Sequence, residues 1–213
     1  MKKVIAFIMT IILAFAMISC TCSSNSTPAL GDSEVAVVDS MFVEHTIAMD
    51  RQAMYNKVGG DYRWYETCIK LNNWLDEDND GSIEMMVNVF QVVESRETGS
   101  FDTYVYKFQH FANGESAEDS VHGFWVEDWP LEEEEIKVTF AQAFDLVMRT
   151  NYPKPHTHNV VLRKEVGPKA CNPQWIFGNL KEQLYVDAVT GEVRPTSPAF
   201  NSMNLGTPLG EWP

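Results

Sequence analysis

The sequence predicts an α+β fold made of two helix-plus-antiparallel-sheet units, in the order helix, four strands, helix, three strands. A helical periodicity at residues 34–58, a second one at 139–150 and runs rich in Val, Ile, Thr, Tyr, Phe and Trp after each helix lead to this prediction. Short connections between the runs are typical of antiparallel hairpins. We therefore expect an N-terminal unit at 34–135, a C-terminal unit at 136–194 and an irregular tail at 195–213.

The first predicted helix, at residues 34–58, has apolar side chains at three- and four-residue steps, which is the spacing of one helix face. Ser33 is a suitable N-cap, and Gly59-Gly60 is a suitable stop signal. His45 falls on this face, where we expect a core histidine rather than a ligand. The residues that define the predicted face are Val38, Met41, Phe42, His45 and Met49.

The predicted strands are recognised by their β-branched and aromatic residues. In the N-terminal unit they lie at 62–75, 83–94, 101–111 and 121–129. In the C-terminal unit they lie at 159–166, 174–177 and 183–189. The connections of the N-terminal unit are short, and one contains Asn113-Gly114, so we expect an antiparallel meander.

The second predicted helix begins after Thr139, which is placed to act as the N-cap with Gln142 as its capping-box partner. One apolar stripe follows at helical spacing, and Asn151-Tyr152-Pro153 ends the helix. We expect the stripe to be core rather than a ligand-binding surface. Its members are Phe140, Ala143, Phe144, Val147 and Met148.

The N-terminal residues are typical of an export signal. Met-Lys-Lys precedes an apolar run at 4–18 and then Ser19-Cys20; the run is shorter than the roughly 20 residues of a membrane span. Residues 17–20, Met-Ile-Ser-Cys, resemble the lipobox of bacterial lipoproteins. The resemblance implies a signal peptide at 1–19 and lipidation of Cys20. Cleavage near Ser19 without lipid, and Cys22 as the acceptor, are the alternatives.

Residues 20–33 are polar and rich in turn-forming residues, which predicts a lipidated tether. The expected location is the cell envelope, with the lipid in the outer membrane and the module facing the periplasm. The membrane is then a partner through the lipid anchor alone.

The chain is strongly acidic, with 16 basic and 30 acidic residues and a formal net charge of −14. Removal of 1–19 takes away Lys2 and Lys3 and no acid, which leaves 14 basic and 30 acidic residues and a charge of −16. This charge repels nucleic acid and anionic lipid headgroups. We expect no nucleic-acid partner, whereas calcium or a basic partner surface is compatible with the charge.

Two segments carry a family resemblance. Residues 138–143, Val-Thr-Phe-Ala-Gln-Ala, open the second helix, and residues 183–193 read Gln-Leu-Tyr-Val-Asp-Ala-Val-Thr-Gly-Glu-Val. This combination resembles the PepSY domain over about residues 136–194, and the whole layout resembles the PepSY-like lipoproteins of Bacteroidetes. The resemblance implies a helix over an antiparallel sheet, kinship with two-lobed folds of the β-lactamase-inhibitor type, and a role in restraining peptidases. The proline-bounded loop at 168–173 departs from the simpler PepSY pattern.

The end of this segment also predicts a tight turn. Gly191 follows Thr190 and permits a positive φ. Asp187 and Glu192 are placed to accept hydrogen bonds from turn amides, and we expect this structural role rather than a catalytic pair.

Residues 76–84, Asp-Glu-Asp-Asn-Asp-Gly-Ser-Ile-Glu, match the first nine positions of an EF-hand calcium loop. Position twelve is Val87, where a bidentate Glu is expected, and the flanks predict strands, so a true EF-hand is not predicted. An acidic hairpin turn and a looser calcium site are the two alternatives. No other cofactor is predicted. The residues of the calcium site would be Asp76, Asp78, Asp80 and Glu84.

Several aromatic residues, among them Phe124 and Trp125, lie close together in the predicted meander. Strand alternation sends about half of them to the outer face, where they could bind a peptide or a sugar. Burial under a helix and the tail is the alternative. The residues of this candidate aromatic platform are Tyr104, Tyr106, Trp125 and Trp129.

Other reactive residues give weaker predictions. Cys68 and Cys171 could pair in an oxidising compartment or stay free. His156 and His158 form a His-x-His pair that could hold zinc only with further ligands. The sequence contains no Gly-x-Ser-x-Gly, His-Glu-x-x-His or phosphate-binding glycine loop.

We therefore expect a non-enzymatic cell-envelope lipoprotein that binds a protein or peptide, with peptidase modulation as the role that the resemblance implies. A surface module that binds carbohydrate or calcium during nutrient capture is the alternative. An unrecognised hydrolase is the third hypothesis.

Overall fold

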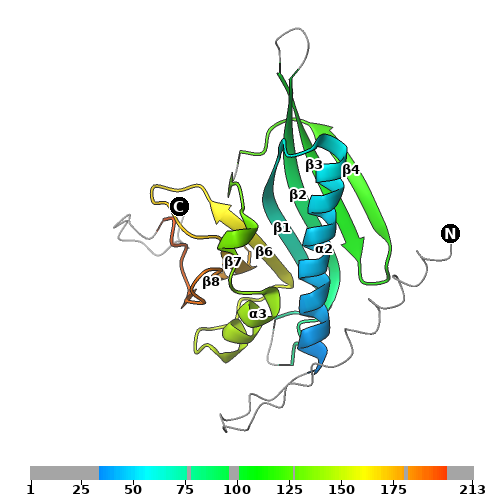
Figure 1. The fold of residues 1–213 in the computed structure, drawn as a ribbon. Coiled ribbons are helices and arrows are strands. Elements are labelled where there is room, and N and C mark those ends of the chain that lie inside the picture. The colour runs from blue at the N-terminus through cyan, green and yellow to red at the C-terminus, as the bar shows by residue number, and fades with distance from the viewer. Residues whose placement is uncertain (1–33, 76–77, 96–100, 127, 180–181, 201–213) are drawn as a thin grey trace, which may run out of the picture. The chain divides into compact units, whose positions relative to one another are not determined.

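The computed structural model describes residues 34–75, 78–95, 101–126, 128–179 and 182–200. Their fold is α+β, as the sequence predicts, and is dominated by an antiparallel sheet (Figure 1). The helices are α2 (Glu34–Val58), the one-turn 3-10 helix η1 (Glu133–Glu135) and α3 (Phe140–Arg149). The strands are β1 (Tyr62–Leu71), β2 (Ile83–Ser95), β3 (Phe101–Phe111), β4 (Ser116–His122), β5 (Asp128–Trp129), β6 (Asn159–Glu165), β7 (Gln174–Gly178), β8 (Gln183–Asp187) and β9 (Val193–Arg194).

One continuous sheet spans both halves of the described chain, in the order β4-β3-β2-β1-β6-β7-β8-β9. The prediction of two separate helix-plus-sheet units is therefore wrong. The connection is the antiparallel pairing of β1 with β6, which runs from Glu66 opposite Arg163 to Lys70 opposite Asn159. No local sequence pattern predicts a pairing between segments about ninety residues apart, because the register between distant strands depends on tertiary packing.

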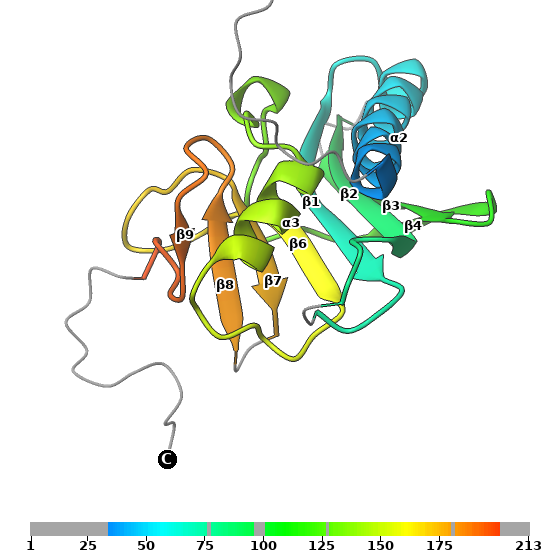
Figure 2. The same ribbon diagram turned by 90° about the horizontal axis from the view of Figure 1, so that it is seen from below.

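Both α-helices cover the same face of the sheet (Figure 2). Four apolar side chains form one row across β1, β6, β7 and β8 under the helices, and all of them are almost completely buried. Each such burial stabilises the fold by about 1.5–3 kcal/mol relative to an exposed side chain. The row consists of Ile69, Val160, Phe177 and Leu184.

The bounds predicted for the first helix match α2, and Gly59 ends it with a φ of +70°. The predicted apolar face is present only in part: Phe42 packs against the core, but His45 is exposed and Met49 is 45% exposed. The side chains of Val38 and Met41 lie outside the described part of the structure. The helix instead buries a face that includes two polar residues, Thr46 and Asp50. Its buried apolar residues are Val43, Ile47 and Met54.

The start and the packing of α3 confirm the sequence analysis. The Thr139 hydroxyl accepts a hydrogen bond from the Gln142 amide at 3.2 Å, and the Gln142 side chain accepts one from the Thr139 amide at 2.9 Å. This is the predicted capping box. The stripe residues Phe140, Ala143, Phe144 and Val147 are buried, and Met148 packs against the same core.

The fourth predicted strand, at 121–129, is wrong. β3 turns directly into β4 through a tight turn in which Gly114 has a φ of +88° and the Phe111 amide donates to the Glu115 carbonyl at 2.9 Å. β4 therefore begins at Ser116. Its polar sequence, Ser-Ala-Glu-Asp-Ser-Val-His, has little strand propensity, so the pairing with β3 rather than composition defines the strand.

Two segments cross the sheet face that lies opposite α2 and α3, which we call the open face. The chain between β4 and β5 crosses β3 and β2, with the Gly123 amide donating to Thr103 and the Trp125 amide to Gln91. Residues 195–200, which we call the C-terminal strap, bury Ser197 and Ala199. The predicted irregular tail thus begins with a packed segment, and residues 201–213 lie outside the described part.

Candidate functional site

The open face carries a groove of about 390 Å³ over β2, β1, β6 and β7, and it is the candidate functional site. The sheet register places Cys68, Val161 and Ile176 side by side along its floor. Met85 adds a further apolar side chain from β2. The volume lies within the range of about 300–1,000 Å³ that is usual for ligand pockets.

Polar and cationic side chains surround this apolar floor. Lys70 lies at the β1 side and forms an ion pair with Glu84 at 2.7 Å. The rim also carries the amide side chains of Asn159, Asn179 and Gln183. A groove with an apolar floor and amide groups at its rim can accept an apolar side chain while hydrogen-bonding to a peptide backbone.

Arg163 stands at one end of the groove, beside buried carboxylates from its own strand and from two others. Its Nη2 atom donates to Glu165 at 3.0 Å, and its Nε atom lies 3.7 Å from Asp128 Oδ1. Glu66, its register partner on β1, supplies a third carboxylate. Burial alone would lower the pKa of the guanidinium, but the charges of Asp128, Glu165 and Glu66 outweigh burial and raise it.

The same charged cluster ties the C-terminal strap to the sheet. The Ser197 hydroxyl donates a hydrogen bond to the Glu165 carboxylate. Tyr185 lies near both residues, and the pKa of its hydroxyl is raised, mainly because it is buried. The Tyr185 hydroxyl donates to Gln183 at 2.5 Å. The strap, the charged cluster and the groove rim therefore form one connected surface.

Cys68 and Cys171 are both free. Cys68 lies on the groove floor in β1, whereas Cys171 lies in the loop after β6. Burial, reinforced by the adjacent Glu66 carboxylate, raises the pKa of the Cys68 thiol. A raised pKa disfavours the thiolate, so Cys68 has no activation as a nucleophile here.

The predicted calcium loop forms the connection between β1 and β2. Asp80 accepts a hydrogen bond from the Ser82 amide at 3.0 Å, which lowers the pKa of its carboxyl group, and Glu84 pairs with Lys70. Asp78 is exposed, and Asp76 lies outside the described residues. Over the described part of the chain, no three His, Cys, Asp or Glu side chains are placed to hold a metal ion.

The loop is organised by Asn79 instead. Its side-chain amide donates to the carbonyls of Asn73 and Trp74 at 3.0 and 2.8 Å, and its oxygen accepts from the Gly81 amide at 2.7 Å. Gly81 has a φ of +77°, which favours glycine. The EF-hand-like spacing thus coincides with an Asn-centred turn.

The candidate aromatic platform is split by the sheet. Tyr104 and Tyr106 lie opposite Val92 and Phe90 of β2 and share the face covered by α2. Trp125 lies over the open face instead, with Lys107 Nζ 6.0 Å from its ring centroid.

Trp129 occupies a third position. It pairs with Lys164 in the β5–β6 ladder and is 52% exposed. The structure therefore does not bring Tyr104, Tyr106, Trp125 and Trp129 together on one surface.

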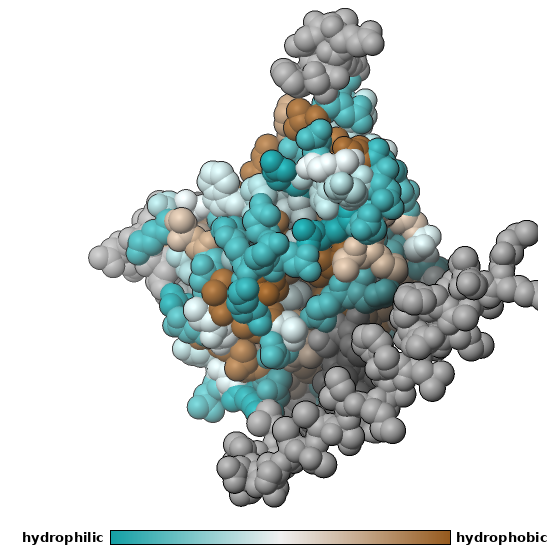
Figure 3. Space-filling view, viewed as in Figure 1, coloured by the Kyte–Doolittle hydropathy of each residue, from teal (hydrophilic) through white to brown (hydrophobic). Residues whose placement is uncertain are grey.

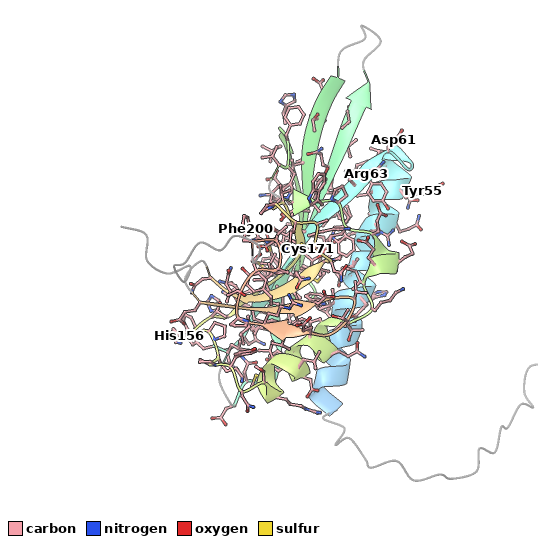
Figure 4. All side chains as sticks on the ribbon, turned by 90° about the vertical axis from the view of Figure 1, so that its left-hand side faces the viewer. Tyr55, Asp61, Arg63, His156, Cys171 and Phe200 are labelled. Atoms are coloured by element: carbon pink, nitrogen blue, oxygen red, sulfur yellow. The ribbon has the colours of Figure 1, made fainter. Side chains whose placement is uncertain are left out.

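The His-x-His pair packs on an aromatic ring. The indole of Trp74 stacks on His156 with a centroid distance of 4.1 Å and on His158 with 4.7 Å. Figure 4 shows His156 well away from Cys171, because their loops lie at opposite ends of β6. The stack joins the β1–β2 loop to the loop before β6.

The predicted turn after β8 is present. Asp187 Oδ1 accepts hydrogen bonds from the Val189 and Thr190 amides, both at 2.9 Å, and Gly191 has a φ of +77°. Burial acts to raise the pKa of Asp187, but these bonds and that from Asn172 outweigh it and lower the pKa. Glu192 forms an ion pair with Arg194 rather than binding a turn amide through its side chain.

Sequence reasoning missed the groove and its charged end. The available signal was the alternation in β6, which puts Asn159, Val161, Arg163 and Glu165 on one face.

No family model, no curated protein and no solved structure matches the chain. In the described residues, no helix is both long and apolar enough to cross a membrane.

Proposed function

We propose that this chain is a non-enzymatic, lipid-anchored module of the bacterial cell envelope that holds a protein or peptide segment on the open face of its sheet. The groove floored by Cys68, Val161 and Ile176 is the observation that carries the proposal. By contrast, hydrophilic side chains dominate the surface on the side of α2 (Figure 3). The open face is therefore the better candidate for an apolar contact.

The chemistry of the groove favours a peptide. Its apolar floor suits one or two aliphatic or aromatic side chains, and burying them provides most of the binding free energy. The amide side chains of Asn159, Asn179 and Gln183 can exchange hydrogen bonds with a peptide backbone.

The anchor would determine where this module works. Lipidation at Cys20 would hold the module to the membrane through residues 20–33, which could extend to roughly 45 Å. The PepSY resemblance, on which the envelope location also draws, suggests a peptidase as the partner. The module would then restrain the enzyme by holding a segment of the enzyme in the groove.

A capture experiment with matched variants tests this proposal. The full chain is used as bait in an envelope extract, beside Val161→Glu in the groove and Glu134→Lys on η1. We expect the same protein to be captured by the wild type and by Glu134→Lys, and to be lost with Val161→Glu. Circular dichroism checks that the variants fold. Equal capture by the wild type and Val161→Glu would refute the groove as the binding site.

The exposed rings favour carbohydrate binding as a second candidate. Phe124 and Trp129 are 73% and 52% exposed, and a sugar ring can stack on such side chains. Titration calorimetry with soluble polysaccharides distinguishes the two functions. Binding that is lost in Trp129→Ala but kept in Val161→Glu would favour the carbohydrate module.

The looser calcium site belongs to the same second candidate, and it is tested separately. Calorimetric titration of the chain with millimolar calcium would give heat that disappears in Asp78→Asn/Asp80→Asn. Absence of heat in the wild type would end the calcium hypothesis.

A further inference from the structure

Among the described residues, no strand pairs with the outer edge of β4. β4 is the terminal strand of the sheet, and all of its residues from Ser116 to His122 are exposed. Its pairing with β3 has no register shift from Tyr104–His122 to His110–Ser116. In Figure 2, β3 and β4 extend outward beyond α2.

The register identifies which backbone groups face outward. The bonds from Phe111 to Glu115 and from Gly123 to Thr103 mark the hydrogen-bonded pairs at the two ends of the ladder. The alternation of antiparallel pairs therefore turns the amide and carbonyl groups of every second β4 residue away from β3. These residues are Ser116, Glu118, Ser120 and His122.

Native edge strands are usually protected by proline, by a bulge or by charged side chains, especially lysine. β4 has no proline, lysine or bulge within its seven residues, and its charged side chains are the acidic Glu118 and Asp119. The one local device is Asp119, whose carboxylate accepts a hydrogen bond from the outward Ser120 amide at 2.8 Å. This contact lies within the strand and can be exchanged for a bond to a partner strand.

The surroundings of the edge are acidic. Four carboxylates lie on or beside it, against the two ammonium groups of Lys57 and Lys107. The local net charge of this set is −2, and the whole chain carries −14. The carboxylates belong to Asp102, Glu115, Glu118 and Asp119.

Apolar side chains stand next to these charges at one end of the strand. Val121 is 52% exposed on the open-face side, and Phe124 follows just after the strand with 73% exposed. The edge thus combines outward-facing backbone amide and carbonyl groups, a negative charge and an apolar end.

We propose that β4 accepts an extended, basic segment of a partner protein as an added strand. Main-chain hydrogen bonds would form with the outward groups of β4, basic side chains would lie beside Glu118 on the α2 side of the sheet, and apolar side chains would pack on Val121 on the open-face side. This edge is separate from the groove, so the inference does not depend on the proposed function.

Two blocked ten-residue peptides test this inference with the full chain. One alternates Lys and Val, and the other alternates Glu and Val. We expect the Lys–Val peptide to bind at least about ten-fold more tightly. It should also slow hydrogen exchange at the amides of Ser116, Glu118, Ser120 and His122. Equal affinities, or protection at other amides only, would overturn the inference.

A backbone variant tests strand addition directly. Ser120→Pro removes an outward amide without removing a bond to β3, and Ser120→Ala is its matched control because it keeps the amide. We expect Lys–Val binding to weaken about ten-fold or more in Ser120→Pro and to change little in Ser120→Ala. Unchanged binding in a folded Ser120→Pro variant would overturn the inference.

A charge variant keeps the test valid should Ser120→Pro fail to fold. Glu118→Lys/Asp119→Lys should reverse the preference toward the Glu–Val peptide. Glu132→Lys/Glu134→Lys, which changes the net charge equally at the start of η1, should not. Equal effects of the two double variants would show a general charge effect and overturn the inference.

Other occupants of the edge give distinct outcomes. Slow exchange at the outward amides of the peptide-free chain would mean that the edge is already covered, and this would overturn the inference. Protection that rises with protein concentration would identify a second copy. Protection independent of concentration would identify a segment of this chain.

Discussion

The buried carboxylate of Asp50 on α2 accepts a 2.7 Å hydrogen bond from the side-chain amide of Asn88 on β2. Both residues are nearly inaccessible, with 3% and 0% exposed. The Asn88 oxygen accepts a bond from Thr67 at 2.5 Å, and the Asp50 carboxylate also lies 2.9 Å from His110 Nε2. This network fixes α2 to the sheet at the place where its apolar face is interrupted.

Asn88→Ala should lower the free energy of unfolding by about 2–3 kcal/mol, because the partners of its amide, Asp50 and Thr67, would lose a hydrogen bond while buried. Asn56→Ala is the control, because it removes only an exposed hydrogen bond from Gln52 on the surface of α2. Its free energy of unfolding should stay within about 0.5 kcal/mol of the wild-type value. Urea unfolding measures both variants. Equal losses would contradict a stabilising role of the network.

The pH dependence of stability should reveal Asp50. Burial is the main reason why the pKa of Asp50 is raised above 3.8, although Asn88 and His110 act in the opposite direction. The native state therefore holds this proton more tightly than the unfolded state, and the contribution of Asp50 to stability falls as the pH rises above 3.8.

Asp50→Asn does not ionise, so it isolates this contribution. The wild type should lose stability relative to Asp50→Asn as the pH rises from 3.5 toward neutrality. Urea unfolding at several pH values measures the difference. A difference that is constant with pH, or that changes in the other direction, would contradict a raised pKa.

The bounds of α2 and α3 are predictable from the sequence, but only α3 presents the face that the pattern indicates. Its capping box and apolar stripe are local and agree with each other. In α2, by contrast, the buried face contains Thr46 and Asp50, while Met49 is exposed. A buried polar residue whose partners come from distant strands carries no local signal, so apolar spacing alone indicates the wrong face.

Arg163→Leu should destabilise the protein by about 3 kcal/mol at neutral pH, because it leaves the carboxylates of Glu66, Asp128 and Glu165 close together without their cation. The loss should shrink as the pH falls and the carboxylates become protonated. Arg194→Leu removes a more exposed arginine, paired with Glu192, and is the matched control. Its loss should be within about 1 kcal/mol.

Thermal unfolding of the two arginine variants at pH 7 and pH 4 checks this prediction. Similar losses for Arg163→Leu and Arg194→Leu would contradict the role of the charged cluster. So would a loss in Arg163→Leu that grows as the pH falls.

Gly178→Ala should cost about 3 kcal/mol or more. Gly178 lies at the groove rim with a φ of +135°, and an added Cβ atom would meet the Glu182 carbonyl oxygen at 2.0 Å. Gly60→Ala is the control, since a Cβ atom there meets nothing within 4 Å. Equal melting temperatures of the two variants would contradict the tight approach at Gly178.

The groove was harder to predict than the helices. Its residues come from five strands, and the β1–β6 pairing that joins them has no sequence signal. The acidic loop, by contrast, has a clear local pattern, but Asn79 and Gly81 use it to shape a turn. Local motifs thus indicate turns and caps, whereas the site depends on which strands become neighbours.

Site-specific photo-crosslinking in cells that make this protein tests whether the groove binds a protein partner. A photoreactive amino acid is placed at Val161 in the groove and, as the control, at Glu134 on η1. We expect one protein adduct at position 161 that is absent at position 134. No adduct at position 161, or the same adduct at both positions, would contradict binding in the groove.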